Sequence, residues 1–491
     1  MSHAMPLYCA DAVRAIERAA FARGVDAFGL MTQAGEAAAA LLRERWPQVR
    51  RVGVLCGTGN NGGDGYVAAL ALHRSGLQVD AVASGEPRTP EARAAAARWR
   101  AAGHDVRTLA SGVPDADAWI DALFGIGLSR APEAPVAALM QAVAAQRRPV
   151  LALDVPSGID ADRGSAPGAF LPAAMTLCFV AAKRGLFTAL GREAAGEVHV
   201  DPLGLDVDAL AAAASEGAPS AWAVRASDLA DALPVRRLDS HKGHHGRVLC
   251  LGGDHGMAGA LVLCAEAAAR GGAGWVEALS RPETVFALNV RRPEVMAGVV
   301  PAEDALASRL VAAGVVAVGP GLGQGEWGRG LFEAALASGR PLVLDADALN
   351  LLAEAPRALP GAVLTPHPGE AARLLGCRTE EVQSDRFAAL DALVARFGAA
   401  VVLKGAGTVV AAPGETPRLI DAGHPGMASA GMGDALTGLV AALRAQGLSP
   451  FDAAWVGALA HSAAADAVGR GRGRGLLAND VIGAFGPVLN P

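Results

Sequence analysis

The decisive stretch of this 491-residue chain is Val52-Gly53-Val54-Leu55-Cys56-Gly57-Thr58-Gly59-Asn60-Asn61-Gly62-Gly63-Asp64-Gly65. Its apolar, β-branched start predicts a strand, and its glycines predict a turn that leads into a helix at 62–75. A glycine turn at a helix N-terminus is a ready anion-binding site. The stretch Gly431-Met432-Gly433-Asp434 has the same character and opens an Ala- and Leu-rich helix. We therefore predict two active sites, one in each half of the chain, that both bind nucleotide-like ligands.

Short β-branched runs alternate with Ala-rich helical segments along the whole sequence. The first half is expected to hold strands at 51–56, 78–83, 105–109, 117–123, 149–154, 175–181 and 196–200, with helices at 9–22, 33–45, 62–75, 89–102 and 133–146. The second half is expected to hold a strand within 246–253, further strands at 275–279, 294–299, 315–318, 341–345, 362–365, 399–403, 408–411 and 417–420, and helices at 257–271, 327–338, 347–354, 368–375, 379–397, 433–446, 450–469 and 478–484. This rhythm predicts an α/β protein with mainly parallel sheets.

The Ala-, Ser-, Gly- and Pro-rich segment 206–224 is interpreted as the boundary between two domains, 1–213 and 225–491. The first is expected to be a Rossmann-like parallel-sheet domain, and the second an α/β domain with a larger sheet. Pro413-Gly414 lies between two short strands and predicts an antiparallel hairpin there.

The composition is that of an ordinary globular protein, with 52% hydrophobic and 19% charged residues. The formal net charge of -6, without a basic stripe, argues against nucleic acid as a partner. The six cysteines have no framework spacing, so we expect them to be reduced and the protein to be cytoplasmic. We expect no signal peptide and no membrane span.

Lysine is rare in this chain, because almost all the positive charge is carried by arginine. The three lysines are Lys183, Lys242 and Lys404, and each lies next to a glycine-containing segment. An Arg-favouring genome explains the rarity, but a chain that keeps three lysines is expected to need them.

Three acidic residues fall at the carboxyl ends of predicted strands in the first half: Asp64, Asp121 and Asp154. Ligands of open α/β sheets bind at such ends, so these residues are expected to converge on one crevice. Two carboxylates about 4 Å apart repel by about 4 kcal/mol at an effective dielectric constant of about 20, and therefore need a proton, a cation or a donor. Asn61 and Ser157 add neutral oxygen ligands, which together suit a monovalent cation better than zinc.

A second glycine loop, Gly125-Ile126-Gly127-Leu128-Ser129-Arg130, is expected beside the same crevice. Its backbone amides could cradle a phosphate, with Arg130 nearby. The alternative is that these glycine stretches are ordinary turns, that Asp64 holds one of them through its own backbone, and that Asp154 caps another.

Together, Gly59–Gly65, Asp121–Gly127 and Asp154–Asp160 resemble the NAD(P)H-hydrate epimerase family (YjeF N-terminal domain) over about residues 1–210. The resemblance implies a potassium ion held by Asn61, Asp121 and Ser157. Epimerisation at C6 of the hydrate needs a proton donor and acceptor, and Asp154 is the candidate. The resemblance also implies that hydrated NAD(P)H is bound by Asp154 and by Asn60, Asn61, Gly62, Gly63, Asp64, Gly125, Ile126, Gly127, Leu128, Ser129, Arg130 and Ala131.

In the second half, four predicted strands end in the polar or glycine-rich segments Val318–Gly323, Leu344–Asn350, Leu364–Glu370 and Val401–Thr408. The dipole of the helix that follows Gly431 stabilises an anion at its N-terminus by about 0.3–1 kcal/mol. This is enough to orient a phosphoryl group but does not alone supply the binding affinity. Asp434 at the helix start can take a proton from a substrate hydroxyl. Taken alone, His367, Asp345 and Asp347 have structural explanations, the two aspartates as helix caps.

In their order along the chain, these four strand-end segments and Gly431–Asp434 resemble the ribokinase-like branch that contains the NAD(P)H-hydrate dehydratases (YjeF C-terminal domain). The resemblance covers about 225–491, and His241–Val248 resembles that family's opening segment. The resemblance implies ADP as the phosphoryl donor, with ATP as the alternative, and Mg²⁺. Asp434 is the expected base, and phosphate leaves after transfer to the hydrate hydroxyl. The implied nucleotide contacts are Lys404, Gly405, Ala406, Gly407, Thr408 and Gly433, and the implied hydrate contacts are Ala258, Gly321, His367 and Asp434.

These resemblances predict a bifunctional enzyme that interconverts the R and S hydrates and dehydrates the S form, producing NAD(P)H, AMP and phosphate. A homo-oligomer is expected, as is common in these families. Two alternatives stay open: a ribokinase-like small-molecule kinase with a regulatory N-terminal domain, and a non-catalytic nucleotide-binding module at the N-terminus.

Overall fold

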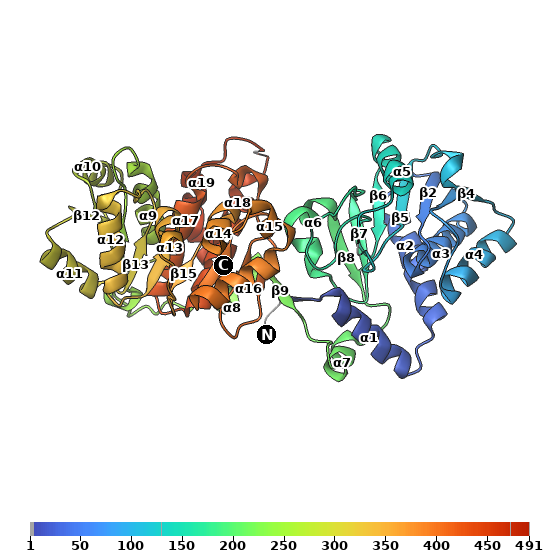
Figure 1. The fold of residues 1–491 in the computed structure, drawn as a ribbon, viewed down its shortest axis with the longest axis horizontal. Helices are drawn as coiled ribbons and strands as arrows, with labels where there is room; N and C mark the ends of the chain where they lie inside the picture. Colours follow the sequence, from blue (N-terminus) through green and yellow to red (C-terminus); the bar gives the residue numbers. More distant parts are fainter. Residues whose placement is uncertain (1–3, 129, 472, 491) are drawn as a thin grey trace. The chain divides into compact units, whose positions relative to one another are not determined.

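The structure, a computed structural model, describes residues 4–128, 130–471 and 473–490. The chain forms two compact units: one is Pro6–Ala221, and the other begins at Trp222 and also takes in Ala4 and Met5. Each unit has its own sheet with helices packed against it, as Figure 1 shows. The predicted α/β class is therefore confirmed for both. Within the described ranges, no helix is both long and apolar enough to cross a membrane.

The first unit is built on a seven-stranded sheet in the order β4-β3-β2-β5-β6-β7-β8. All its strand pairs are parallel, and the chain changes direction across the sheet between β2 and β5, where Leu55 lies opposite Asp121. Such a switch point forms a crevice at the carboxyl ends of the strands. The elements are β2 (Arg51–Cys56), β3 (Gln78–Ala83), β4 (Val106–Thr108), β5 (Ala118–Ala122), β6 (Val150–Leu153), β7 (Met175–Phe179), β8 (Glu197–Asp201), α1 (Ala10–Ala22), α2 (Ala27–Arg45), α3 (Asn60–Arg74), α4 (Pro90–Ala101), α5 (Ala134–Ala145), α6 (Ala189–Ala194) and α7 (Val207–Ala213).

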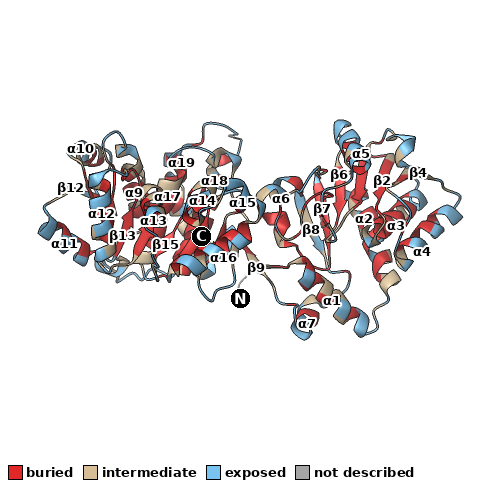
Figure 2. Cartoon of the chain, viewed as in Figure 1, coloured by how far each residue is buried: buried red, intermediate tan, exposed pale blue. Residues whose placement is uncertain are grey.

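Alternate residues of these strands face opposite helical layers. Val54 and Ile120 pack with residues of α2, α3 and α4, whereas Leu55 and Trp119 pack with residues of α5. Figure 2 shows the strands buried and the outer sides of the helices exposed. Because both faces of the sheet are covered, its strands appear in the sequence as continuous apolar runs, which is why they could be predicted.

Helix α3 begins at Asn60, two residues earlier than predicted, so Asn60–Gly65 is the start of a helix and not a wide loop. A Cβ at Gly62 would lie 2.0 Å from the carbonyl oxygen of Gly57. A Cβ at Gly65 would lie 2.8 Å from the Cβ of Ala122 in β5. These glycines therefore allow α3 to approach the ends of β2 and β5 closely.

The second unit is built on an eleven-stranded sheet in the order β1-β9-β18-β17-β16-β15-β14-β13-β10-β11-β12. The strands from β12 to β16 pair in parallel, and β17 is antiparallel to β16 and to β18, which confirms the hairpin at Pro413-Gly414. Its strands are β1 (Met5–Leu7), β9 (Ala221–Val224), β10 (Arg247–Leu251), β11 (Trp275–Ser280), β12 (Met296–Val299), β13 (Val315–Val318), β14 (Leu342–Leu344), β15 (Val363–Leu364), β16 (Ala400–Leu403), β17 (Val409–Ala411) and β18 (Arg418–Ile420).

Helices α9, α17, α18 and α19 cover one face of this sheet and share a core with alternate strand residues such as Val248 and Cys250. Helix α18 is apolar and buried along most of its length. The helices are α8 (Leu229–Ala232), α9 (Ala258–Arg270), α10 (Pro282–Arg291), α11 (Glu303–Ala312), α12 (Glu326–Ala337), α13 (Ala346–Glu354), α14 (Pro368–Leu375), α15 (Thr379–Ser384), α16 (Arg386–Phe397), α17 (Met432–Ala445), α18 (Pro450–Gly469), α19 (Ala478–Gly483) and α20 (Phe485–Leu489).

The predicted linker 206–224 is largely structured. Asp206 caps α7 by accepting from the Ala209 amide at 3.1 Å, and β9 pairs in parallel with β18. The single helix predicted at 379–397 is two helices, because the Asp385 side chain caps α16 by accepting from the Ala388 amide at 2.9 Å. Helices α10 and α11 were not predicted, since each buries only two side chains.

Candidate active sites

Asp154 follows β6 in a tight three-residue turn, in which the Val155 amide donates to the Leu153 carbonyl at 2.8 Å. Its φ of +68° lies in the left-handed region, which is costly for a residue other than glycine. Strain of this kind is concentrated at functional sites. The Asp154 carboxylate accepts from the Ile126 amide at 3.3 Å, and this amide lies in the glycine loop after β5. The structure thus brings two of the predicted site segments together.

Lys183, which the sequence analysis did not assign to the site, pairs directly with Asp154. Its side chain is 1% exposed, and its ammonium group donates to Asp154 Oδ1 and, at 2.6 Å, to the Phe179 carbonyl. Burial disfavours the charged form, but Asp154 and weaker neighbours outweigh it and raise the pKa of Lys183. The first site therefore contains a lysine whose charged form is favoured, and the rarity of lysine was the only signal for it in the sequence.

Two further carboxyl groups act on Asp154, namely Asp64 of α3 and Glu17 of α1. Burial, followed by the charges of Asp154 and Glu17, raises the pKa of Asp64 well above its usual value. Burial, followed by Asp154, also raises the pKa of Glu17, although Lys183 and two arginines oppose the rise. Three carboxyl groups around one ammonium group can hold and exchange a proton. Glu17 was not predicted, because α1 lies far from the glycine motifs in the sequence.

Asp121 and Ser157 are in contact, as the sequence predicted. The Ser157 hydroxyl donates to Asp121 Oδ1 at 2.6 Å, and the Ser157 amide donates to Oδ2 at 2.8 Å. Burial raises the pKa of Asp121 to about 6, although the hydrogen bonds from Ser157 and from the Leu123 amide oppose this. A buried carboxyl group with this pKa gains stability from a nearby cation.

The amide nitrogen and oxygen of the Asn61 side chain are buried, and neither has a hydrogen-bond partner among the described residues. A Cβ at Gly125 would lie 3.5 Å from Asn61 Cγ and 2.9 Å from Asp154 Oδ2. The preceding residue, Phe124, donates its amide to the Ser157 hydroxyl at 3.0 Å. The unpaired amide oxygen and the nearby hydroxyl and carboxylate oxygens form a donor set that fits a hard cation. In the described part of the chain, no group of three His, Cys, Asp or Glu residues is placed to hold a metal ion.

In the described remainder of the predicted hydrate-binding loop, Gly127, Arg130 and Ala131 are exposed and Leu128 is half-buried. Arg130 is exposed and pairs with Glu133 at 3.1 Å, so its guanidinium is shared with a neighbouring carboxylate. Ser129 lies outside the described residues.

In the second unit, Gly431 caps α17 with a φ of +90°, and Asp434 lies in the first turn of that helix. Burial, followed by the charge of Asp345, raises the pKa of Asp434 to about 6, while Lys404 opposes the rise. A carboxylate with this pKa is well matched to removing a proton near neutral pH. The predicted base is therefore in an environment that suits its role.

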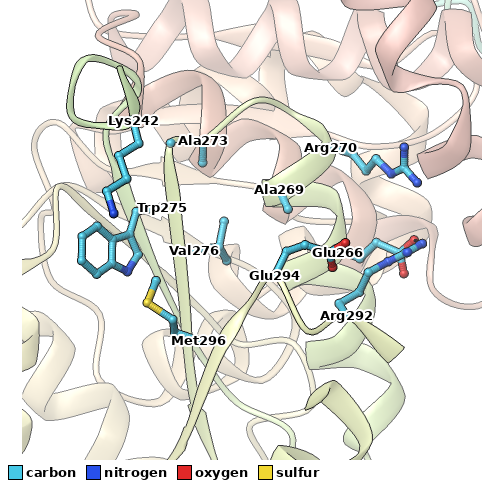
Figure 3. Close-up of a pocket in the computed structure, with 11 residues that line it drawn as sticks. Lys242, Glu266, Ala269, Arg270, Ala273, Trp275, Val276, Arg292, Glu294 and Met296 are labelled. Atoms are coloured by element: carbon cyan, nitrogen blue, oxygen red, sulfur yellow. Dashed lines mark hydrogen bonds and ion pairs between the residues drawn. The ribbon is translucent and has the colours of Figure 1, made fainter. Parts of the chain in front are cut away.

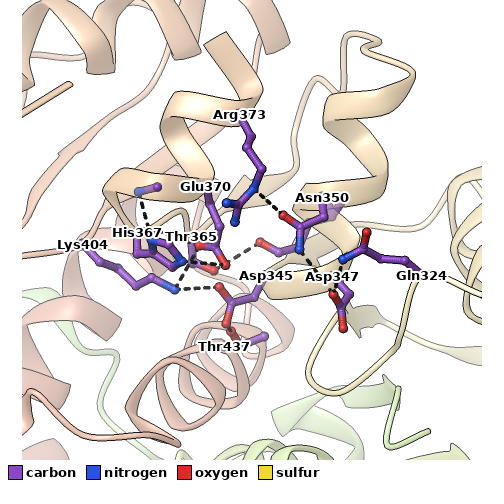
Figure 4. A network of polar contacts seen from close by, with 12 residues as sticks. Gln324, Asp345, Asp347, Asn350, Thr365, His367, Glu370, Arg373, Lys404 and Thr437 are labelled. Carbon is purple, nitrogen blue, oxygen red and sulfur yellow. Dashed lines mark hydrogen bonds and ion pairs between the residues drawn. The ribbon is translucent and has the colours of Figure 1, made fainter. Parts of the chain in front are cut away.

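Lys404 takes part in a polar network at the carboxyl ends of β14, β15 and β16 (Figure 4). Its Nζ is 2.7 Å from Asp345 Oδ1 and 3.7 Å from Glu370 Oε2. The Thr437 hydroxyl of α17 donates to Asp345 Oδ2 at 2.9 Å. Burial would raise the pKa of Asp345, but Lys404 and the hydroxyl donors lower it below its usual value. The lysine and Asp345 thus form a charged pair next to Asp434.

The segment Lys404–Thr408 is a compact loop. The Gly405 amide donates to the Thr408 hydroxyl at 3.3 Å, and that hydroxyl donates back to the Gly405 carbonyl at 3.1 Å. The buried side chain of Arg386, from α16, donates to the carbonyl oxygens of Leu403 and Lys404 at 2.9 and 3.2 Å. Through these two hydrogen bonds, Arg386 fixes the start of the loop. It was not predicted, because nothing in its sequence surroundings distinguishes it from other helix arginines.

The predicted hydrate contacts of this unit lie at the carboxyl ends of strands. Gly321 has a φ of +60°, and a Cβ there would lie 2.7 Å from the Met257 carbonyl, one residue before Ala258 at the start of α9. His367 caps α14: its Nδ1 accepts from the Gly369 amide at 3.0 Å. Burial, only partly offset by Glu370, lowers the pKa of His367. Its ring is half exposed, so it can serve as a cap and still border the site.

A cavity of about 550 Å³ lies at the opposite, amino-terminal ends of β11 and β12 (Figure 3). It is lined by Lys242, Trp275 and Met296 among others. Lys242 Nζ lies 4.6 Å from the centroid of the Trp275 ring. This cavity contains none of the predicted site residues, and Lys242 is the one lysine that lies in neither site.

Two family models match the chain in the order of the two units. The model of the YjeF-related protein N-terminus matches 27–185, and the model of the NAD(P)H-hydrate dehydratase family matches 248–485. The bifunctional NAD(P)H-hydrate repair enzyme Nnr of Escherichia coli (strain K12) is 44% identical over 490 residues, which cover 99% of this chain and 94% of that protein. The enzyme of the same name from Coxiella burnetii is 42% identical and covers 99% of each chain.

Among solved structures, a ribokinase-like superfamily protein from Enterococcus faecalis matches with a TM-score of 0.52 and 27% identity, covering 55% of this chain and 95% of its own. This supports the ribokinase-like fold of the second unit. Given the identity over the full length to both curated relatives, the chain belongs to the family of bifunctional NAD(P)H-hydrate repair enzymes.

Proposed function

We propose that the two units divide the repair of NAD(P)H hydrate between them, with Asp154 as the acid–base group of the epimerase and Asp434 as the base of the dehydratase. The bifunctional activity follows from the family. The assignment of the two aspartates is supported by one shared observation. Each lies at a strand end or helix start, beside a lysine that is buried in the first unit and partly buried in the second, in a unit of its own.

For the epimerase, the hydroxyl at C6 of the hydrate is attached next to the ring nitrogen. Asp154 takes the hydroxyl proton, the C6–N bond breaks to give an aldehyde, and the nitrogen takes a proton. The raised pKa values of Asp64 and Glu17 make them suitable sources of that proton. Closure on the other face of the carbonyl reverses these transfers and inverts C6.

For the dehydratase, Asp434 takes the proton of the C6 hydroxyl, and the oxygen attacks the terminal phosphorus of the nucleotide. The bond from that phosphorus to the bridging oxygen breaks, so that ADP leaves as AMP and the phosphoryl group is carried on the C6 oxygen. Phosphate is a better leaving group than hydroxide, so it departs from C6 with help from the ring nitrogen. Loss of a proton from C5 then restores the double bond. The nucleotide is assigned to Lys404, Gly405, Ala406, Gly407, Thr408 and Gly433, and the hydrate to Ala258, Gly321, His367 and Asp434.

The proposed cofactors are ADP, Mg²⁺ and K⁺. Mg²⁺ is commonly held by one or two carboxylates together with substrate phosphates, so we propose that it binds with the nucleotide. K⁺ is assigned to Asn61, Asp121 and Ser157, on the strength of the buried, unpaired Asn61 amide. When bound, it supplies a fixed positive charge beside Asp121.

The functional domains are proposed as 1–213 and 225–491. The free state of all six cysteines supports a reducing, cytoplasmic location. A homo-oligomer is supported by the exposed apolar side chains of Phe286, Val290, Met296 and Val299 at the β12 edge of the sheet.

The test is recovery of the near-ultraviolet absorbance of reduced nicotinamide from a mixture of R and S hydrates, with ADP, with ATP and without nucleotide. Full recovery that requires a nucleotide supports both activities and identifies the donor. Recovery that stops at the S fraction would mean that the first unit does not act as an epimerase. A stable phosphorylated product without recovery would favour the small-molecule kinase.

A further inference from the structure

Two strained turns lie side by side at the ends of neighbouring strands β6 and β7. In the first, Asp154 has a φ of +68°; in the second, Val180 has a φ of +66°, and the Ala181 amide donates to the Phe179 carbonyl at 2.7 Å. Both are positive-φ conformations at residues other than glycine, and such conformations persist only where the surroundings hold them. The question is which interaction holds this pair.

One side chain joins the two turns. The Lys183 ammonium donates to the Asp154 carboxylate of the first turn and to the Phe179 carbonyl of the second. The Cys178 thiol adds a weaker contact to the Asp154 carbonyl at 3.2 Å. The Lys183 backbone is fixed in turn, because Tyr8 forms a bridge with it and donates its amide to the Ala182 carbonyl at 2.8 Å.

The charges around Asp154 make this lysine necessary. Asp64 and Glu17 both act on Asp154 with charge of the same sign, and Lys183 is the buried cation that faces them. Without it, the Asp154 carboxylate would face two carboxyl groups and the Cys178 thiol, and would be expected to turn away or take up a proton.

We propose that Lys183 is a positioning residue of the epimerase: by bridging the Asp154 carboxylate and the Phe179 carbonyl, it fixes the orientation in which Asp154 meets the hydrate. The inference rests on the proposed role of Asp154. Lys183 is 1% exposed and acts through Asp154, not on the substrate.

The experiment measures epimerisation of the R hydrate by full-length Lys183→Met, Lys183→Arg, Asp154→Asn and the Asp154→Asn/Lys183→Met double variant. Dehydration of the S hydrate by the same proteins reports that the chain is intact, and Lys242→Met is the matched lysine control. We expect Lys183→Met to lower the kcat of epimerisation by about 10- to 100-fold, the scale of a misplaced catalytic group, with little change in KM. The acidic limb of its pH profile should move to higher pH, and Lys183→Arg should return that limb toward wild type.

The double variant is the decisive comparison, since a residue that acts only through Asp154 adds nothing once Asp154 is removed. We expect it to be no slower than Asp154→Asn. If the two losses multiply, or if Lys183→Met keeps the wild-type kcat while Asp154→Asn is slow, the positioning role is overturned. If Asp154→Asn itself keeps the wild-type rate, the proposed role of Asp154 fails instead. If Lys183→Met does not fold, Lys183→Arg decides: a lowered kcat at unchanged KM supports the inference, and a wild-type kcat overturns it.

Discussion

The two sites use the same pair of residue types in different ways. In the first unit, the lysine lies directly on the proposed catalytic carboxylate, so that Lys183 pairs with Asp154. In the second unit, Lys404 pairs with Asp345, and the proposed base Asp434 lies beside this pair. Two of the three lysines of the chain are used in this manner.

The difference affects the surroundings of the two proposed catalytic groups. Where the cation is bound by a second aspartate, the remaining carboxylate feels burial and a like charge more than the lysine, and the pKa of Asp434 rises to about 6. That arrangement suits a base that must take a proton near neutral pH. Where the cation touches the catalytic group itself, orientation is gained, and neighbouring carboxyl groups can supply the proton.

The largest expected effect comes from removing one catalytic carboxylate at a time. Asp434→Asn should lower dehydration by about 10²- to 10⁴-fold, the usual contribution of a general base, and leave epimerisation unchanged. The measurement is the rate of each step with purified R and S hydrates. Loss of both activities in a folded protein would contradict the separation of the sites.

Removing the second-unit lysine tests whether Lys404 supports Asp434. In Lys404→Met, the carboxylates of Asp345 and Glu370 face Asp434 without a cation, so the pKa of Asp434 should rise above about 6. We expect dehydration to fall by about 10- to 100-fold, with weaker nucleotide binding, because an unpaired buried charge is costly. Lys242→Met is the control. An unchanged acidic limb would argue against the electrostatic role.

Two glycine substitutions compare the steric tolerance of the sites. A Cβ at Gly125 would lie 2.9 Å from the Asp154 carboxylate, whereas one at Gly433 would lie 3.3 Å from both Asp345 Oδ2 and Lys404 Nζ. Gly125→Ala should therefore lower epimerisation by about 10-fold or more, because it displaces the catalytic group itself. Gly433→Ala should have the smaller effect on dehydration. The reverse order of the two effects would mean that Asp154 is less restricted than the structure implies.

The smallest effect is a difference between pH profiles. Asp434 is protonated below its pKa of about 6, so kcat/KM for dehydration should fall about tenfold per pH unit below that value. Epimerisation measured over the same range gives the second profile, because its proposed catalytic carboxylate pairs with Lys183 and not with a second aspartate. A dehydration profile that stays level below about pH 6 would contradict the role of Asp434 as the base.

Much of the fold could be predicted because covered parallel strands leave continuous apolar runs, as in Val52–Cys56, and because glycine turns follow them. The meeting of Asp121 with Ser157 could be predicted from their places at strand ends. The pairing of Lys183 with Asp154 could not, because it joins residues 29 positions apart through a turn that no local pattern indicates. Helices α10 and α11 bury too few side chains to give a clear period.

The most direct test of two separate sites in one chain is complementation between the single variants, with the R hydrate as substrate and the uncatalysed reaction as background. Asp154→Asn alone should produce reduced nicotinamide no faster than spontaneous epimerisation allows, and Asp434→Asn alone no faster than its residual dehydration allows. Mixed together with nucleotide, they should restore rapid recovery, because one protein supplies the S hydrate and the other dehydrates it. A mixture as slow as its components would contradict the account.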